Sequence, residues 1–245
     1  MFQSNSKPCL IVLSSKPAAS SFKLIDKGIK LSFLLQIKKL LNFHNIDWSI
    51  ATLTGIKPLI NNENDEKAID WLKENEAKFF SPINLEKTEA KNYSGILFLN
   101  LFGYYSEFYS AKKTNEVVEI KEYLQKNENK AFTGLIREFC QLKRPIGFIG
   151  YGVIPLFQVF NGGEWRFREF NLTSIPISQE FREIYFSSLP FLIEETVREL
   201  EGNFVYSEKS NEIAMVDQNL VSGQNDEALM SVVMLFISLI KRMEG

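Results

Sequence analysis

The strongest constraint on the fold of this chain is the regular alternation of short apolar segments with amphipathic ones. Four apolar segments predict strands that are buried on both faces, as parallel strands are: 9–15, 47–53, 95–100 and 145–149. The intervening segments carry apolar residues at three- and four-residue spacing, which predicts helices over 28–45, 66–80, 115–125 and 135–143. Strands that alternate with helices indicate a doubly wound α/β fold, a mostly parallel sheet with helices on both faces.

Beyond residue 152 the expected elements become shorter and more varied. An apolar helix is expected over 153–160, a turn over 161–163, a half-exposed strand over 165–168, helices over 179–186 and 190–201, short strands over 203–206 and 213–216, and a buried helix over 228–240. The chain has no internal repeat, low-complexity tract or long linker. We therefore expect residues 1–245 to form a single domain.

Charge and hydropathy exclude several classes of partner. The chain has 28 Lys and Arg against 30 Asp and Glu, which gives a net charge of −2, so no nucleic-acid partner is expected. The most apolar run, 228–240, is shorter than the roughly 20 residues that span a bilayer. Residues 1–8 show neither a signal nor a transit pattern. We expect no membrane span and a cytoplasmic location.

The supply of thiols and imidazoles is small, with two Cys and one His in the chain. This excludes a zinc cluster with four N or S ligands and a disulfide framework, and we expect neither a metal nor a cofactor. Cys9 and Cys140 lie in apolar elements and are predicted to be buried side chains rather than a redox pair. His44 falls at the end of the first helix, where it is expected to be an ordinary helix-end residue.

A tight turn is predicted where the strand over 145–149 runs directly into Gly150-Tyr-Gly152. Such a turn projects one side chain from the carboxyl end of the sheet, while the following helix aims backbone N–H groups at the same place. The glycines at 147, 150 and 152 could also suggest a dinucleotide-binding loop. Their spacing lacks the third glycine of that motif, so we favour the tight turn.

Three segments together resemble one family. Residues 144–153 resemble the nucleophile elbow of the class I glutamine amidotransferase-like superfamily, in its PfpI and Parkinsonism-associated deglycase branch, and residues 217–225 resemble the late strand of that family. Residues 189–198, with 202–204, are similar to the animal glutamine amidotransferase-like class 1 domain-containing proteins. The resemblance implies a flavodoxin-like, amidotransferase-like fold over nearly the whole chain.

The residues that carry the family's chemistry are missing here. The position that matches the nucleophilic cysteine is Gly150, and the next position, a His in many members, is Tyr151. The acidic residue that the family places after the first strand should lie within 14–24, and that stretch has no Asp or Glu. The resemblance therefore implies no catalytic residue, and we expect a pseudoenzyme rather than an enzyme.

Although the catalytic side chains are missing, the resemblance implies that the backbone of an anion-binding site remains. Its N–H groups would come from Tyr151, Gly152 and the loop around Gly103. The large side chains Phe102, Tyr104, Tyr105 and Tyr151 could instead fill the vacated pocket, and we favour this interpretation. The vestigial pocket predicted from the sequence thus consists of Gly150, Tyr151, Gly152, Gly103, Phe102 and Tyr104. The five aromatic residues within 102–109 favour an exposed partner surface as readily as a filled pocket.

Two functional hypotheses follow. The first is an inactive amidotransferase-like protein that serves as an interaction or structural subunit, with a protein partner, as a homodimer or within a larger assembly. The alternative is a hydrolase- or deglycase-like enzyme, or a small-anion binder, that uses the N–H groups of the elbow with Tyr151 or a serine. Ser14 and Ser15 follow the first strand, but no base lies near them in the sequence.

Overall fold

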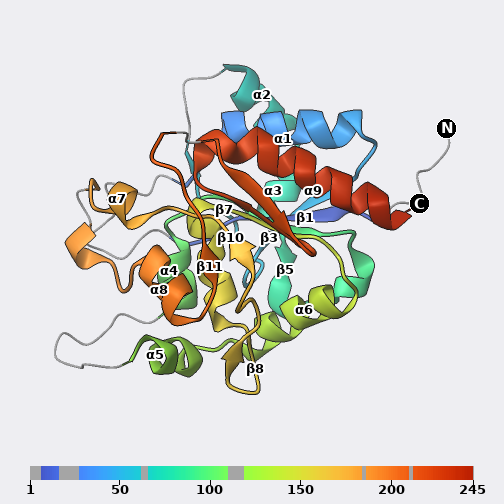
Figure 1. The fold of residues 1–245 in the computed structure, drawn as a ribbon. Helices are drawn as coiled ribbons and strands as arrows, with labels where there is room; N and C mark the ends of the chain where they lie inside the picture. Colours follow the sequence, from blue (N-terminus) through green and yellow to red (C-terminus); the bar gives the residue numbers. More distant parts are fainter. Residues whose placement is uncertain are drawn as a thin grey trace.

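The computed structural model describes residues 7–16, 28–61, 66–109, 119–183, 186–209 and 212–244 (Figure 1). At the centre is a seven-stranded sheet in the order β12 (Ala214–Asp217), β13 (Leu220–Gly223), β7 (Ile146–Ile149), β6 (Ile96–Phe98), β1 (Cys9–Val12), β3 (Trp48–Thr52) and β5 (Ile83–Asn84). Neighbouring strands run parallel except β12, which is antiparallel to β13. The predicted parallel arrangement of the four apolar segments is confirmed.

Helices cover both faces of this sheet, as predicted. Helices α1 (Leu31–Phe43) and α9 (Leu229–Glu244) pack side by side on one face, and α6 (Lys130–Gln141) covers the opposite face with η2 (Leu85–Lys87) and η3 (Ala90–Asn92) (Figure 1). Two glycines let α9 approach the strands closely. A Cβ at Gly95 would lie 2.7 Å from Phe236 Cζ, and a Cβ at Gly147 would lie 3.2 Å from Phe236 Cδ2. The fully buried Phe236 ring occupies the space that these two missing side chains leave.

Helix boundaries differ from the sequence prediction where a local polar contact decides them. The helix expected over 66–80 is interrupted at Asn75, which gives α2 (Glu66–Glu74) and α3 (Glu76–Phe80). In the segment 115–125, the structure has α5 (Ile120–Lys126), and residues 110–118 lie outside the described part. Helix α6 begins earlier than expected because the Asn129 side chain accepts a hydrogen bond from Phe132 N and caps the helix.

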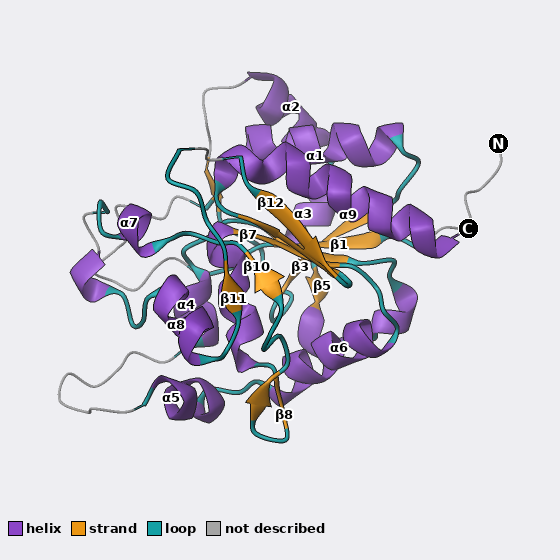
Figure 2. Ribbon diagram, in the orientation of Figure 1, coloured by secondary structure: helices purple, strands orange, loops and turns teal. Residues whose placement is uncertain are grey.

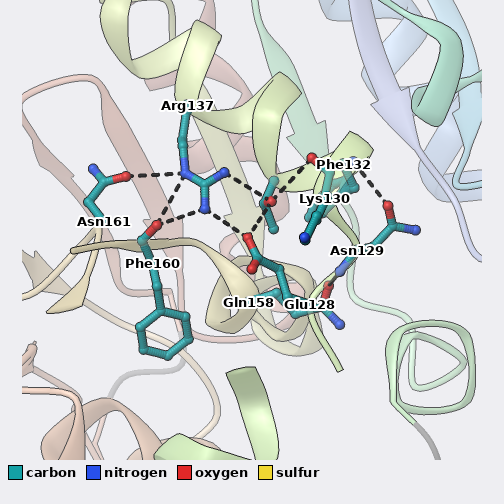
Figure 3. A network of polar contacts seen from close by, with 9 residues as sticks. Glu128, Asn129, Lys130, Phe132, Arg137, Gln158, Phe160 and Asn161 are labelled. Atoms are coloured by element: carbon teal, nitrogen blue, oxygen red, sulfur yellow. Dashed lines mark hydrogen bonds and ion pairs between the residues drawn. The ribbon is translucent and has the colours of Figure 1, made fainter. Parts of the chain in front are cut away.

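A network of polar contacts fixes the start of α6 to the chain that follows β7 (Figure 3). Arg137 donates to Glu128 Oε1 at 2.8 Å and to the backbone oxygen of Phe160 at 2.7 Å. The side chain of Gln158 accepts from Asn129 N at 3.0 Å and donates to the backbone oxygen of Phe108. The segment between α5 and α6 is therefore tied to the interior rather than free at the periphery.

The chain after β7 departs most from the prediction. The expected α-helix is the 3₁₀ helix η4 (Gly150–Gln158), and it contains Pro155, which has no N–H for an α-helical hydrogen bond. The predicted turn joins β8 (Phe160–Asn161) to β9 (Glu164–Trp165). Residues 166–168, expected to belong to a strand over 165–168, lie outside β9. Helix 179–186 is replaced by α7 (Ile177–Glu180) and η5 (Phe186–Ser188).

The remaining elements are short. They are β2 (Ile29–Lys30), β4 (Ile60–Asn61), α4 (Tyr104–Phe108), β10 (Asn171–Leu172), α8 (Ile193–Glu199), β11 (Asn203–Phe204) and η6 (Asp226–Ala228). Helices α4, α7 and α8 gather at the end of the sheet where β7 passes into η4 (Figure 2). Within the described ranges, no helix has both the length and the apolar character needed to cross a membrane.

Helices α7 and α8 hold each other through two glutamates. Glu180, near the end of α7, accepts from the backbone N of Ile193, the first residue of α8, at 3.1 Å. Glu194 of α8 accepts in return from the backbone N of Ile177, the first residue of α7, also at 3.1 Å. Glu180 is fully buried, and its second oxygen has no hydrogen-bond partner. Burial raises the pKa of Glu180 to about 8.

Glu180→Gln should remove a pH dependence of stability. Because folding raises the pKa of Glu180 from 4.5 to about 8, the folded state holds a proton that the unfolded state releases between these pH values. The wild-type protein therefore loses stability as pH rises through this window, by on the order of 2 to 4 kcal/mol from this group. Glutamine keeps the acceptor for Ile193 N and does not ionise.

Urea unfolding at pH 5.5 and pH 8.5 measures the effect. An exposed glutamate of α8 provides a control, since Glu199→Gln should leave the wild-type pH dependence in place. Equal pH dependence in the wild type and in Glu180→Gln would show that Glu180 is ionised in the folded protein at neutral pH.

Candidate functional site

The tight turn predicted after β7 is present, and Gly150 forms it. Gly150 has φ +48, in the left-handed region that favours glycine, and Ser174 Oγ donates to its backbone oxygen at 2.9 Å. A Cβ at Gly150 would lie 2.4 Å from Asn100 Oδ1 and 3.2 Å from Ile175 Cδ1. Backbone geometry and neighbouring atoms therefore both disfavour a side chain at the position where the sequence resemblance places the nucleophile.

The side chain of Asn100 occupies the space in front of this turn. Its Oδ1 accepts a hydrogen bond from Tyr151 N at 2.9 Å, and its Nδ2 donates to Asp226 Oδ1 at 2.9 Å. Asn100 follows β6, Tyr151 follows β7 and Asp226 follows β13, so the carboxyl ends of three parallel strands meet here. Burial raises the pKa of Asp226, and the hydrogen bond from Asn100 opposes that shift. The Tyr151 N–H that could bind an anion thus has an acceptor within the protein.

Aromatic side chains pack behind the turn. The rings of Phe102 and Tyr105 lie 5.2 Å and 5.9 Å from the Tyr151 ring, and 5.2 Å from each other. Tyr105 OH donates to the backbone oxygen of Phe191 at 2.9 Å, in contact with the same cluster. All four side chains are buried. These rings occupy the region beside the elbow where the sequence suggested either a filled pocket or an exposed surface.

The other predicted pocket residues are placed differently. Tyr104 packs against Phe98, and its OH donates to the backbone oxygen of Val12 at 2.8 Å, so it supports β1 instead of joining Phe102 and Tyr151. Gly152 allows a close approach to β6, because a Cβ there would lie 2.5 Å from the backbone oxygen of Phe98. Gly103 precedes α4, and its oxygen accepts from the backbone N of Glu107 at 3.0 Å.

No protein-family model matches the chain. The sequence is 30% identical over 106 residues to glutamine amidotransferase-like class 1 domain-containing protein 1 of Xenopus laevis. The matched region covers 43% of this chain and 46% of the Xenopus protein. The chain spans less than half of that relative in this match. The protein of the same name from Danio rerio is 21% identical over 93% of this chain and 94% of its own length. The chain is thus similar over nearly its whole length to a glutamine amidotransferase-like class 1 domain-containing protein, which supports the resemblance found in the sequence.

Solved structures agree with this similarity at the level of the fold. Rapid Encystment Protein 24 kDa of Francisella tularensis superposes with a TM-score of 0.76 at 18% identity, over 96% of this chain and 99% of that one. Glyoxalase III of Candida albicans superposes with a TM-score of 0.70 at 12% identity, over 95% and 97% of the two chains. The amidotransferase-like fold expected from the sequence is confirmed.

Neither thiol of this chain lies at the elbow. Cys9 begins β1, at the opposite end of the sheet, and burial raises its pKa to about 12. Cys140 lies in α6, before the start of β7, and burial also raises its pKa. His44 follows α1 with its ring 5.1 Å from the Phe43 ring. Within the described ranges, no group of three His, Cys, Asp or Glu side chains is placed to hold a metal ion.

The aromatic segment 102–109 is not an exposed partner surface. Its five aromatic side chains are all at most 7% exposed, so the expectation of exposed rings there is wrong. The tyrosines can be buried because their hydroxyls reach backbone oxygens, as Tyr109 OH does at Ile154. Strongly exposed aromatic side chains lie elsewhere in the described structure, for example Phe43 at 81% and Phe181 at 70%.

The structure also brings together a pair that sequence analysis missed. Ser15 Oγ donates to Glu107 Oε1 at 2.7 Å, although the two residues are 92 positions apart. Glu107 lies in α4, is only 8% exposed, and has its pKa raised by burial. A carboxylate therefore does stand beside the loop after β1, but it comes from another element. The one sequence signal was an acidic residue, Glu107, inside an otherwise aromatic segment.

Gly150→Ala should destabilise the protein more than the left-handed backbone alone explains. Both the φ angle and the contact with Asn100 oppose a Cβ, and we expect the free energy of unfolding to fall by about 2 to 4 kcal/mol. Gly162→Ala is the matched control, since Gly162 has φ +59 and no atom within 4 Å of an added Cβ. It should cost about 1 kcal/mol.

A double-mutant cycle with Asn100→Ala isolates the contact at the elbow. In the Asn100→Ala background, Gly150→Ala should cost less than in the wild type, because the clashing amide is gone, although the contact with Ile175 remains. Urea denaturation of the four proteins gives the coupling energy. A cost for Gly150→Ala equal to that of Gly162→Ala in the wild-type background would contradict this account of the elbow.

Proposed function

We propose that this protein is a catalytically inactive member of the amidotransferase-like superfamily that acts as an interaction or structural subunit. The observation that carries the proposal is the elbow itself, where Gly150 has no side chain and Asn100 accepts the hydrogen bond from Tyr151 N. Elbow chemistry needs a nucleophile on the turn and free N–H groups for the developing negative charge. At Gly150 and Tyr151 both requirements fail.

The surroundings support the same proposal. A thiol could not be added at Gly150 without moving Asn100, and the rings of Phe102 and Tyr105 already pack on Tyr151. Several coordinated substitutions therefore separate this site from one able to form a covalent intermediate. We infer that what the protein contributes is its surface, to a protein partner, to a second copy of itself or to a larger assembly, in the cytoplasm and as a single domain.

A second candidate function is favoured by one observation, the hydrogen bond from Ser15 to Glu107. Ser15 is only half-buried, and it lies at the carboxyl edge of a parallel sheet, where α/β proteins bind their ligands. A carboxylate with a raised pKa is a better general base than an ordinary one near neutral pH. This arrangement would suit a serine-based hydrolase that does not use the elbow nucleophile.

The inactive protein should give no turnover at the elbow. We expect incubation of the purified protein with glyoxal or a peptide substrate to give the rate of the protein-free control, and Tyr151→Phe to give the same. A rate above the control that Tyr151→Phe removes would contradict inactivity. The interaction role is tested separately, by sedimentation at two protein concentrations and by affinity capture from the native source; a monomer that captures nothing would argue against it.

A fluorophosphonate probe separates the two candidates. Reaction at Ser15 would form an Oγ–P bond, pass the hydroxyl proton to the Glu107 carboxylate and release fluoride. For the inactive protein we expect no labelling above that of heat-denatured protein. Labelling that is lost in Ser15→Ala and reduced at least about tenfold in Glu107→Gln, but kept in Ser238→Ala, would favour the hydrolase. Ser238 is a fair control because its hydroxyl donates to a backbone oxygen, that of Met234.

A further inference from the structure

A cavity of about 410 Å³ lies apart from the elbow, between the chain leading into β4 and the helices α2 and α3. Its volume is within the range of about 300 to 1,000 Å³ that is usual for small-molecule sites. Much of its lining is apolar and comes from Leu59, Ile60, Leu72 and Phe80. None of the residues that line it belongs to the site around Gly150.

One cation in this lining has no carboxylate partner. The ammonium of Lys57 lies over the Phe80 ring, 3.7 Å from the ring centroid, and no ion pair of Lys57 exists within the described part of the chain. The other lining lysine, Lys73, is paired with Asp70 at 3.0 Å. Glu76 also lines the cavity, so a ligand with more than one negative charge would be repelled.

The apolar lining is incompletely covered. Phe80 is 53% exposed, although one face of its ring already carries the Lys57 ammonium. Ile56, next to Lys57 in the chain, is 60% exposed. Removing apolar surface from water is favourable, so an apolar molecule placed against the exposed part of the Phe80 ring would be stabilised there.

We propose that this cavity binds a small organic monoanion with an apolar body, such as a medium-chain or aryl carboxylate. The carboxylate accepts hydrogen bonds from the Lys57 ammonium, and the apolar body packs on Leu59, Leu72 and Phe80. This binding is independent of the proposed interaction role, since it uses no residue of the elbow. The protein would thus bind a small ligand away from the elbow, where the Asn100 side chain already accepts the hydrogen bond from Tyr151 N.

The test uses decanoate, with decanol and decyltrimethylammonium as uncharged and cationic analogues of the same chain length. Trp71 reports binding by its fluorescence, because it directly precedes Leu72 in α2 and its ring is 5.6 Å from the ring of Phe79 in α3. Decanoate should bind more tightly than either analogue. Lys57→Met should weaken decanoate binding by about tenfold or more, without a comparable loss for decanol.

Lys73→Met is the matched control, because Lys73 also lines the cavity but is already neutralised by Asp70. We expect this variant to bind decanoate within about twofold of the wild type. Leu72→Asn gives a second variant that should weaken decanoate and decanol alike. The proposal fails if decanoate does not bind, if Lys57→Met binds it as the wild type does, or if Lys57→Met and Lys73→Met lose affinity equally.

Discussion

The hydrogen bond from Tyr151 N to the side chain of Asn100 is the contact on which the candidate site depends. Asn100 directly follows the segment that contains β6. Its side chain is hydrogen-bonded both to Tyr151 N, which follows β7, and to Asp226, which follows β13. A buried N–H without a partner costs about 1 to 3 kcal/mol, so an internal acceptor stabilises the folded chain in the absence of any ligand. The same contact requires Gly150, since any side chain there would meet the Asn100 amide. The position of the Asn100 side chain thus explains both the glycine at the elbow and the absence of a free N–H at Tyr151.

The aromatic residues around the elbow also pack against one another beside the turn. Phe102, Tyr105 and Tyr151 fill the space beside the turn with edge-to-face ring contacts, and the Tyr105 hydroxyl finds a backbone acceptor at Phe191. Such packing contributes to stability and leaves these rings unavailable to a partner. A surface for the proposed interaction must then lie elsewhere, around exposed side chains such as Phe43 and Phe181.

Much of the fold could be predicted because the central strands are apolar on both faces. A continuous apolar run such as β1 identifies itself in the sequence without reference to its neighbours. Boundaries were less predictable where a single contact sets them. Helix α6 starts early because Asn129 caps it, and the segment after Gly150 is a 3₁₀ helix in which Pro155 has no N–H for an α-helical hydrogen bond. A capping hydrogen bond and a missing N–H each depend on a single atom, so the spacing of apolar residues does not predict them.

The sequence alone determined the parallel α/β architecture and the bare alpha carbon at position 150, since both follow from residue type and local order along the chain. Only the tertiary structure decided what surrounds that carbon. Asn100 and Asp226 are 126 positions apart, and Ser15 and Glu107 are 92 apart, yet each pair is hydrogen-bonded. The physical reason is that hydrophobic periodicity along the sequence indicates only which residues are buried. The hydrogen bonds between these distant side chains form only when the folded sheet brings the carboxyl ends of its parallel strands together at one edge.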